Sequence, residues 1–310
     1  MIILYAIPVF MLLIIVEALY DRYRGAGFYR FNDAVGSLST GMLNRTMDFA
    51  TLYLNWAAYS VLFASFSFFS LDNSLLIGFV AFIVYDFFYY WSHRLDHMFS
   101  IFWNAHAVHH QSEEFNLTTA LRQPFSGFVK GSLVYMPMVF LGFDPFMVAT
   151  VGALNLIYQF WVHTRFVGKL GVIELLLVTP SHHRVHHGMN DRYIDKNFGG
   201  VFIVWDRIFS TFQKERDDEP VVFGVRKQLN SFNPFFANFQ IYLLMLKDIW
   251  LGRSVKTTIE VLLSRTGFRP ALVEKRAPTQ RLNLSTYQPF NPQSNRAAKT
   301  LVWSQLLFAL

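Results

Sequence analysis

Apolar runs separated by short polar segments dominate the first half of the chain. A helix needs about 20 consecutive apolar residues to cross a bilayer, and several of these runs approach that length. We expect membrane-spanning or membrane-embedded helices at Ile2–Tyr20, Ala50–Leu71, Leu75–Trp91, Gly131–Leu141 and Phe146–Val162. The last two are short, which predicts a hairpin that dips into the membrane or two tilted helices. The pattern therefore predicts an all-α, polytopic membrane helical bundle.

The flanks of these runs refine the prediction. Ile2–Tyr20 is interrupted only by Pro8 and Glu17. It lacks the basic start and the small-residue cleavage site of a signal peptide, so we expect a permanent anchor. The short linker at 71–74 predicts that the second and third spans are antiparallel neighbours.

Basic residues are distributed unevenly among the connecting segments. The linker at 71–74 has no Lys or Arg, and residues 252–300 hold nine of them against two acids. The loop after the first span holds Arg22, Arg24, Arg30 and Arg45. Because cytoplasmic loops carry an excess of Lys and Arg, we expect this loop, the segment after the third span and the C-terminal region on the cytoplasmic side. The basic tail also suits contact with anionic lipid headgroups.

Composition supports a membrane protein and narrows its chemistry. Of the 310 residues, 53% are hydrophobic and 15% are charged, whereas soluble domains carry about 25% charged residues. The chain has no cysteine, which excludes iron–sulfur clusters, thiolate haem, cysteine-ligated zinc and disulfides. We find no glycine-rich nucleotide-binding motif. An oxidative reaction would therefore need an external electron donor or a separate reductase, and we expect no nucleic-acid partner.

The histidines carry the candidate chemistry. All ten fall between His93 and His187. They form one HxxxH pair, two HxxHH clusters and two further positions: His93 and His97; His106, His109 and His110; His183, His186 and His187; His163 and His182. Residues three and four apart share one face of a helix, so each cluster can aim its imidazoles at one point. So many ligands exceed what one ion can hold, and we expect a dinuclear site in a helical cap on the cytoplasmic face.

Asp86 is the one acid within the third span, and it lies on one helical stripe with Tyr90, His93 and His97. Ionisable residues inside a span are expensive and usually functional. We expect its carboxylate to accept a hydrogen bond from a histidine ligand. The alternative is a buried polar group bonded to a neighbouring helix.

Two further classes of protein use similar ligands. A membrane zinc hydrolase is one, although the HExxH motif typical of such enzymes is missing. A metal transporter or sensor is the other, although transporters place their ligands near the bilayer midplane. The histidines here lie at the predicted membrane–cytosol boundary.

From about Asp86 to Phe212 the histidine pattern resembles the fatty acid hydroxylase/sterol desaturase superfamily of membrane di-iron oxygenases. Several stretches resemble its alkylglycerol monooxygenase branch: Phe115–Gln123, Ile157–Thr164, Thr179–Asn190, Ile194–Gly200 and Trp205–Phe209. The resemblance implies two iron ions held by His93, His97, His106, His109, His110, His163, His182, His183, His186 and His187. It implies O₂-dependent hydroxylation of the carbon beside a lipid ether oxygen, with tetrahydrobiopterin as reductant. Other members desaturate sterols or hydroxylate acyl chains.

The resemblance also directs attention to polar residues around the histidines. Asp86 and Asn197 are the candidate catalytic residues, and Tyr193 is expected to line the pocket with Asn197. The nearby acids Asp191 and Asp195 are expected to offset the charge of the metal ions. Ordinary loop solvation is the favoured interpretation of Glu113 and Glu114.

The remaining expectations concern organisation. We divide the chain into N-terminal spans (1–92), a hydroxylase domain (93–215) and a basic C-terminal region (216–310). Phe239–Trp250 is typical of an interfacial amphipathic helix, and Arg276–Ala298 of a polar linker. The apolar run Leu301–Leu310 predicts a docking helix or a segment cut short. The expected location is a bacterial inner membrane or the endoplasmic reticulum, and the sequence leaves the oligomeric state open.

Overall fold

The computed structural model describes residues 2–127, 130, 133–280, 282–293, 295, 297, 299, 300 and 304. Within these residues the chain is helical, with two isolated bridges and no strand, which confirms the predicted all-α class. The elements are α1 (Ile2–Arg24), α2 (Phe31–Phe66), α3 (Leu75–Met98), α4 (Ser100–His110), α5 (Leu117–Leu121), η1 (Phe125–Gly127), α7 (Met136–Phe140), α8 (Pro145–Trp161), η2 (Gly171–Leu175), α9 (Pro180–His186), α10 (Val204–Ile208), α11 (Pro234–Gly252), α12 (Val255–Leu263), α13 (Ala271–Arg276) and η3 (Leu284–Thr286). The predicted run Leu301–Leu310 lies outside the described residues except for Ser304.

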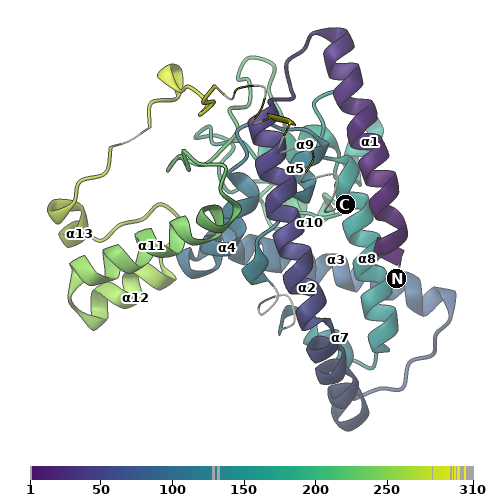
Figure 1. Cartoon of the computed structure of the whole chain (residues 1–310). Helices are drawn as coiled ribbons and strands as arrows, with labels where there is room; N and C mark the ends of the chain where they lie inside the picture. Colours follow the sequence, from purple (N-terminus) through teal and green to yellow (C-terminus); the bar gives the residue numbers. More distant parts are fainter. Residues whose placement is uncertain are drawn as a thin grey trace.

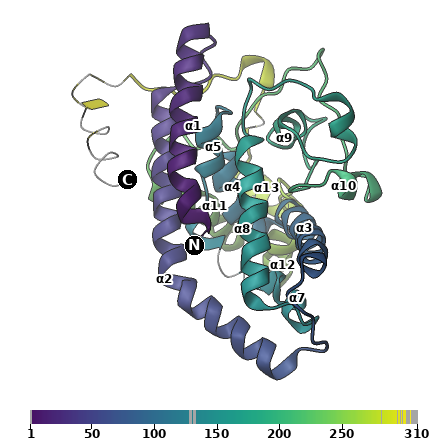
Figure 2. The same cartoon turned by 90° about the vertical axis from the view of Figure 1, so that its right-hand side faces the viewer.

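Helices α1, α2 and α8 run side by side, and α3 runs across them toward the middle of the molecule (Figures 1 and 2). Two apolar clusters hold this arrangement together. One joins α1, α2, α5 and α8 through Ile14, Leu38, Leu117 and Phe160. The other joins α3, α7 and α8 around Ala81, Met138 and Val148. The second cluster fixes α3, which carries the first two histidines.

Among the described residues, α3 is long and apolar enough to cross a bilayer. Helix α2 reaches the same standard only if its two arms, Phe31–Thr51 and Tyr53–Phe66, count as one span bent by 46° (Figure 2). The predicted run Phe146–Val162 forms helix α8, but the 17 residues of this helix are too few for a full crossing of the bilayer. The described helices therefore carry fewer spans than the apolar runs predicted.

Helix α2 corrects the prediction for the first loop. It begins at Phe31 rather than near Ala50, so Arg45 lies in a helix and the loop after α1 is confined to residues 25–30. The early part of α2 is helical because it buries a polar stripe: Asp33, Ser37, Thr40 and Asn44. These positions step by four, three and four residues along one face. A prediction from hydropathy alone therefore assigns these polar residues to a loop.

The predicted antiparallel pairing of α2 and α3 is wrong. The connection runs from Ser67 to Ser74, because α2 ends at Phe66 rather than at Leu71. In the described residues α3 packs chiefly against α4 and α8, and α2 packs against α5 and α7. The two helices approach each other through α7 instead of lying along each other.

The turn predicted at 142–145 forms between α7 and α8. Asp144 caps α8 by accepting hydrogen bonds from the backbone N–H groups of Phe146 (2.8 Å) and Met147 (3.3 Å). Gly142 has φ +92°, and a Cβ there would lie 2.1 Å from the Phe69 carbonyl oxygen. Only glycine fits this approach to the connection between α2 and α3.

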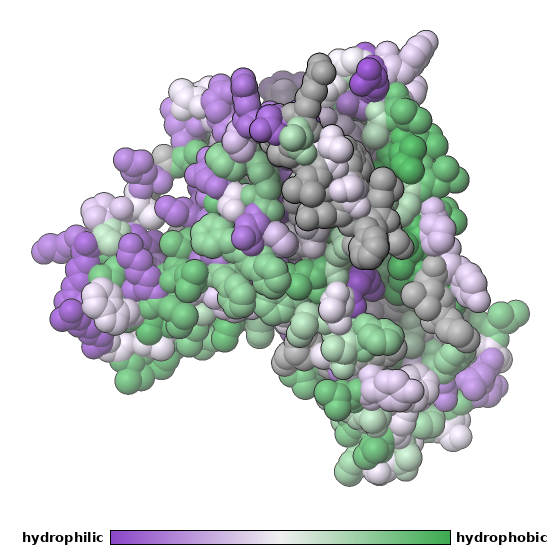
Figure 3. Space-filling model, in the orientation of Figure 1, coloured by the Kyte–Doolittle hydropathy of each residue, from purple (hydrophilic) through white to green (hydrophobic). Residues whose placement is uncertain are grey.

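Helices α11 and α12 form an arm that projects from the body, on the left in Figure 1. Its underside is apolar in the space-filling view (Figure 3). On α11 the exposed apolar side chains are Phe235 and a stripe formed by Phe236, Phe239, Leu243, Leu246 and Trp250. On α12 they are Val255, Ile259 and Leu263. The arm thus presents one continuous apolar face outside the core.

Candidate metal centre

The histidines converge where α3, α4, α9 and the end of α8 meet. His93 and His97 lie one turn apart at the end of α3. Phe99 breaks the helix, and α4 then presents the next cluster in its last turns. Pro180 begins the short helix α9, for which its fixed φ is well suited. Four chain segments therefore deliver imidazoles to one buried place.

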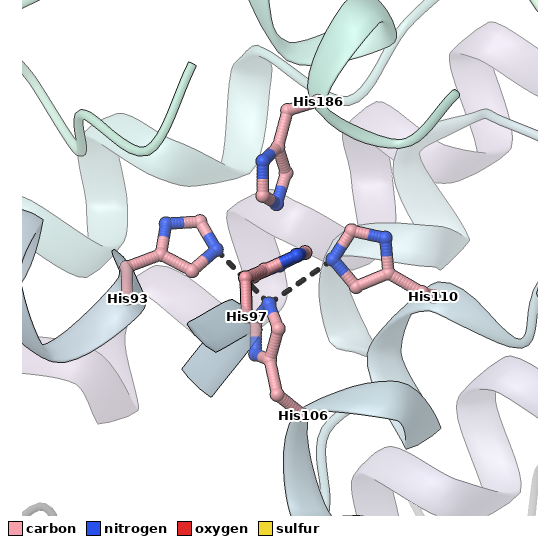
Figure 4. A group of neighbouring side chains, drawn as sticks. All are labelled: His93, His97, His106, His110 and His186. Atoms are coloured by element: carbon pink, nitrogen blue, oxygen red, sulfur yellow. Dashed lines mark hydrogen bonds between the residues drawn. The ribbon is translucent and has the colours of Figure 1, made fainter. Parts of the chain in front are cut away.

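Within the described residues the histidines form two groups. The first histidine group is His93, His97, His106, His110 and His186, drawn in Figure 4. The second histidine group is His109, His163, His183 and His187. In each group the candidate ligand atoms all lie within 4.8 Å of one another. The cluster at 106–110 is divided between the groups, with His109 alone pointing to the second.

Backbone carbonyls orient four of these rings. In each case the Nδ1–H group donates to a carbonyl oxygen: His93 to Phe198 (2.9 Å), His186 to Lys196 (3.0 Å), His109 to Arg122 (2.9 Å) and His163 to Gln159 (2.8 Å). A proton on Nδ1 leaves the lone pair on Nε2 of a neutral imidazole. These rings therefore present Nε2 as the ligand atom, in the manner of metal-binding histidines.

The Nε2 contacts test whether a cation fits. The Nε2 atoms of His109 and His163 lie 3.2 Å apart, although both rings have their proton on Nδ1. Two facing lone pairs repel each other unless a cation lies between them. Imidazole nitrogens bound to one ion at about 2.0–2.1 Å would lie roughly 2.9–3.4 Å apart. The separation observed here matches that geometry.

The first group passes the same test. Nε2 of His106 lies 2.9 Å from Nε2 of His93 and 3.0 Å from that of His110, as the dashed lines in Figure 4 mark. The buried Nε2 atoms of His97 and His186 have no protein hydrogen-bond partner. Buried polar atoms are normally satisfied, so two orphaned nitrogens aimed at one point indicate a missing ligand. The residues of both groups fit metal ions.

Burial also sets the protonation state. It lowers the pKa of His109 to about 4, and it lowers the pKa values of His106, His110, His183 and His187 well below the usual value, with neighbouring histidines adding to the effect. These imidazoles are therefore neutral near pH 7. Neutral imidazole is the form that binds a metal ion.

His182 lies apart from both groups of the described histidines. Its ring packs edge-on against Phe212 at 5.5 Å between centroids, and its carbonyl accepts a hydrogen bond from the Asn197 side chain (3.0 Å). The resemblance carried His182 over as a ligand, but α9 turns this ring about 100° away from His183.

The contacts of Asp86 match the alternative prediction, a buried polar group bonded to neighbouring helices, and not a hydrogen bond from a histidine ligand. No histidine donates to it; its carboxylate accepts from the backbone N–H groups of Val201 (2.8 Å) and Phe202 (3.0 Å) and from the side chains of Asn155 and Trp205. The expected hydrogen bond from a ligand is therefore wrong. The physical reason is that the Val201 and Phe202 amides, together with side chains from α8 and α10, take up the acceptor capacity of the carboxylate.

Asn197 is fully buried, and its side chain is bonded to the backbone. Its side-chain amide donates to the carbonyls of His182 (3.0 Å) and Gln213 (2.8 Å), and its Oδ1 accepts from the Gln213 N–H. It holds a left-handed backbone conformation, with φ +55°. The Tyr193 hydroxyl likewise bonds the backbone, at Glu219. Both residues shape loops around the site.

The loop acids differ from expectation as well. Glu114 is buried, not solvated, and pairs with Arg30 and Arg165. Glu113 accepts from the Gln228 side chain and the Phe290 N–H. Both carboxylates join segments far apart in the sequence.

Two acids approach the histidines directly. Asp195 lies 3.4 Å from Nδ1 of His97, and Asp96 lies 4.0 Å from Nδ1 of His106 and pairs with Lys130. Asp191 is exposed and pairs with Arg226. Asp96 was missed, although its place inside the HxxxH motif was a usable signal.

Glu17 and Arg122 are further residues that the sequence analysis missed. Glu17 of α1 accepts from the Leu117 N–H (2.9 Å) and from the Thr164 and Tyr29 hydroxyls. Arg122 donates to the Val108 carbonyl (2.7 Å). An acid within an apolar run was the signal for Glu17. No local feature of the sequence marks Arg122, because its carbonyl comes within hydrogen-bond distance of His109 only in the folded chain.

Comparison with known proteins identifies the domain. Residues 78–211 match the family model for fatty acid hydroxylases. The chain is 36% identical over 267 residues to the alkylglycerol monooxygenases of Xenopus tropicalis and Homo sapiens, which covers 86% of the chain and 59% of each relative. It is 27% identical to an ornithine lipid hydroxylase of Rhizobium tropici over 42% of the chain and 40% of that protein. No solved structure matches. The chain thus spans about three fifths of the length of these monooxygenase relatives, and its residues 78–211 match the fatty acid hydroxylase family. These matches confirm the resemblance predicted from the motifs.

Proposed function

We propose that the chain is a membrane-bound di-iron oxygenase that hydroxylates a lipid, with alkylglycerol ethers as substrates. The observation that carries this proposal is the pair of buried histidine groups, whose Nε2 atoms face one another at 2.9–3.2 Å. The similarity to alkylglycerol monooxygenases supports the substrate class.

Nine histidines are the proposed ligands, five for one ion and four for the other. Two ferrous ions bound there would supply the reducing power that activates O₂ toward a C–H bond. The overall reaction joins one C–H bond, O₂, two electrons and two protons to give C–OH and water. At the carbon beside an ether oxygen the product is a hemiacetal, which collapses to an aldehyde and free glycerol.

The protein orients the imidazole rings and keeps them uncharged. Carbonyl oxygens of Phe198, Lys196, Arg122 and Gln159 fix four of the rings. Burial lowers the pKa values of five histidines, which keeps them uncharged before metal binds: His106, His109, His110, His183 and His187. Asp96 and Asp195 place negative charge beside the first group. The electrons come from outside the chain, and we propose reduced tetrahydrobiopterin as their source.

The membrane supplies the substrate. Helix α3 is the clearest candidate span of the described residues, and it ends in His93 and His97. A lipid in the bilayer therefore has a short path to the site. We propose that the apolar underside of the α11–α12 arm rests in the membrane interface, and that the site and the basic C-terminal region face the cytoplasm.

The test uses the full chain in proteoliposomes with ferrous iron, reduced tetrahydrobiopterin, O₂ and an alkylglycerol. We expect fatty aldehyde and free glycerol in step with O₂ consumption, and no product without O₂. The matched acylglycerol ester separates this from a hydrolase, which would release fatty acid in the absence of O₂. Ether cleavage that is independent of O₂, or that zinc alone supports, would overturn the proposal.

One observation favours a second candidate. The similarity to an ornithine lipid hydroxylase makes hydroxylation of an acyl chain the alternative reaction of the same site. Mass spectrometry of the recovered lipids distinguishes the two, because an acyl hydroxylase adds one oxygen atom without cleaving the lipid.

A further inference from the structure

Two ligands of the first histidine group are oriented by one loop. His186 of α9 donates to the Lys196 carbonyl, and His93 of α3 donates to the Phe198 carbonyl two residues later. The loop therefore links the orientation of rings that come from two different helices. Its backbone position decides the direction of both Nε2 atoms.

The loop has a conformation that other contacts must hold. Asp195 and Asn197, which are separated by Lys196, have φ values of +57° and +55°, which L-residues rarely adopt. Gly199 follows, where a Cβ would lie 2.6 Å from the Phe202 carbonyl oxygen. Such a backbone persists only when its surroundings determine it.

Asp206 of α10 provides that determination. This side chain is fully buried. One carboxylate oxygen accepts from the Phe198 N–H (2.8 Å) and the other from the Gly199 N–H (2.8 Å). The Thr211 hydroxyl donates to it as well, at 2.6 Å. The N–H groups of Phe198 and of the next residue, Gly199, are therefore both held by the Asp206 side chain.

The Phe198–Gly199 peptide group connects Asp206 to His93. Its N–H donates to Asp206, and its C=O accepts from Nδ1 of His93. Hydrogen bonds in such a chain polarise one another, so a charged acceptor on the N–H side makes the carbonyl a stronger acceptor. A stronger hydrogen bond at Nδ1 raises the basicity of Nε2 as a ligand.

We propose that Asp206 is a positioning residue for the first histidine group and acts through residues 196–199. This inference rests on the proposed metal centre. The second histidine group is oriented independently, by the carbonyls of Arg122 and Gln159. Loss of Asp206 should therefore weaken one ion and spare the other.

The test compares Asp206→Asn with wild type and with Asp191→Asn, an exposed carboxylate outside the site, as the matched control. An asparagine keeps the size but turns an N–H group toward one of the loop amides. The full chain in detergent is loaded with ⁵⁷Fe, and chelator competition is followed by iron content and Mössbauer spectra. We expect Asp206→Asn to bind the ion of the first histidine group about 10- to 100-fold more weakly than wild type, so that the chelator removes it. The ion of the second group should be retained as in wild type.

A second variant covers a failure to fold. Thr211→Val removes one donor from Asp206 and leaves the carboxylate in place, so it should weaken the same ion by a smaller factor. Retention of both ions in Asp206→Asn, or parallel loss of both, would overturn the inference, because a merely structural effect would not distinguish the two groups. A wild-type chain that does not bind two ions would instead overturn the proposed function.

Discussion

At the residue scale, histidine spacing predicted which rings share a helical face but not how they divide. His106, His109 and His110 read as one cluster, yet His109 joins the second group. Its direction is set by the Arg122 carbonyl, and a backbone carbonyl has no signature in a sequence. The same reason explains the error at Asp86. Its acidity and spacing are visible in the sequence, but the donors that the fold brings to its carboxylate are not.

His182 tests the division between ligand and neighbour. We expect His182→Ala to keep both ions and to lose activity only in part, because its ring packs on Phe212 outside both groups. We expect His183→Ala to lose one ion and all activity, because its Nε2 lies 2.9 Å from that of His163. Iron content and lipid oxidation of the two variants are measured side by side. Loss of a whole ion from His182→Ala would show that this ring reaches the metal.

Asp86→Asn should act on stability more than on metal. Four donors converge on this buried carboxylate, and an amide can serve only part of them. A buried group left unsatisfied costs about 1–3 kcal/mol. We expect a lower unfolding temperature for the metal-free chain, measured by scanning calorimetry in detergent with Asp191→Asn as control. An unchanged unfolding temperature would show that the hydrogen bonds of Asp86 do not contribute to stability.

At the scale of elements, the apolar runs predicted the helices α1, α3 and α8 and the turn at 142–145, since their neighbours are chiefly apolar. Helix α2 was cut short in the prediction because its first turns bury Asp33, Ser37 and Thr40 against the protein. The arm was predicted in part: Phe239–Trp250 falls within α11, but α12 gave no signal of its own. Tertiary burial of polar faces is what hydropathy cannot see.

The α11–α12 arm yields a clean labelling experiment, since the chain has no cysteine. Leu246→Cys places a nitroxide on the apolar stripe, where the native side chain is 57% exposed. Lys256→Cys places one on the polar side of the arm, where the native side chain is 87% exposed. In proteoliposomes we expect the label at 246 to collide with O₂ and to be shielded from an aqueous nickel complex, and the label at 256 to show the reverse. Equal access of the nickel complex to both would contradict interfacial burial.

At the scale of the whole molecule, the metal centre gathers segments from most of the chain. Glu17 in α1 connects to Leu117 and to Thr164, the residue after His163. Glu114 connects to Arg30 and Arg165. These contacts explain why α1, which reads as a simple anchor in the sequence, is part of the structure that holds the second histidine group.

The central claim is that the two histidine groups each hold one iron ion. The most direct measurement is the number of iron ions per chain in the purified protein of these 310 residues, loaded anaerobically with ferrous iron and quantified against amino-acid analysis. We predict about two ions per wild-type chain from the division of the ligands, and about one in either His106→Ala or His163→Ala. A value of about one iron in wild type, or the same loss of both ions from either single variant, would contradict the account.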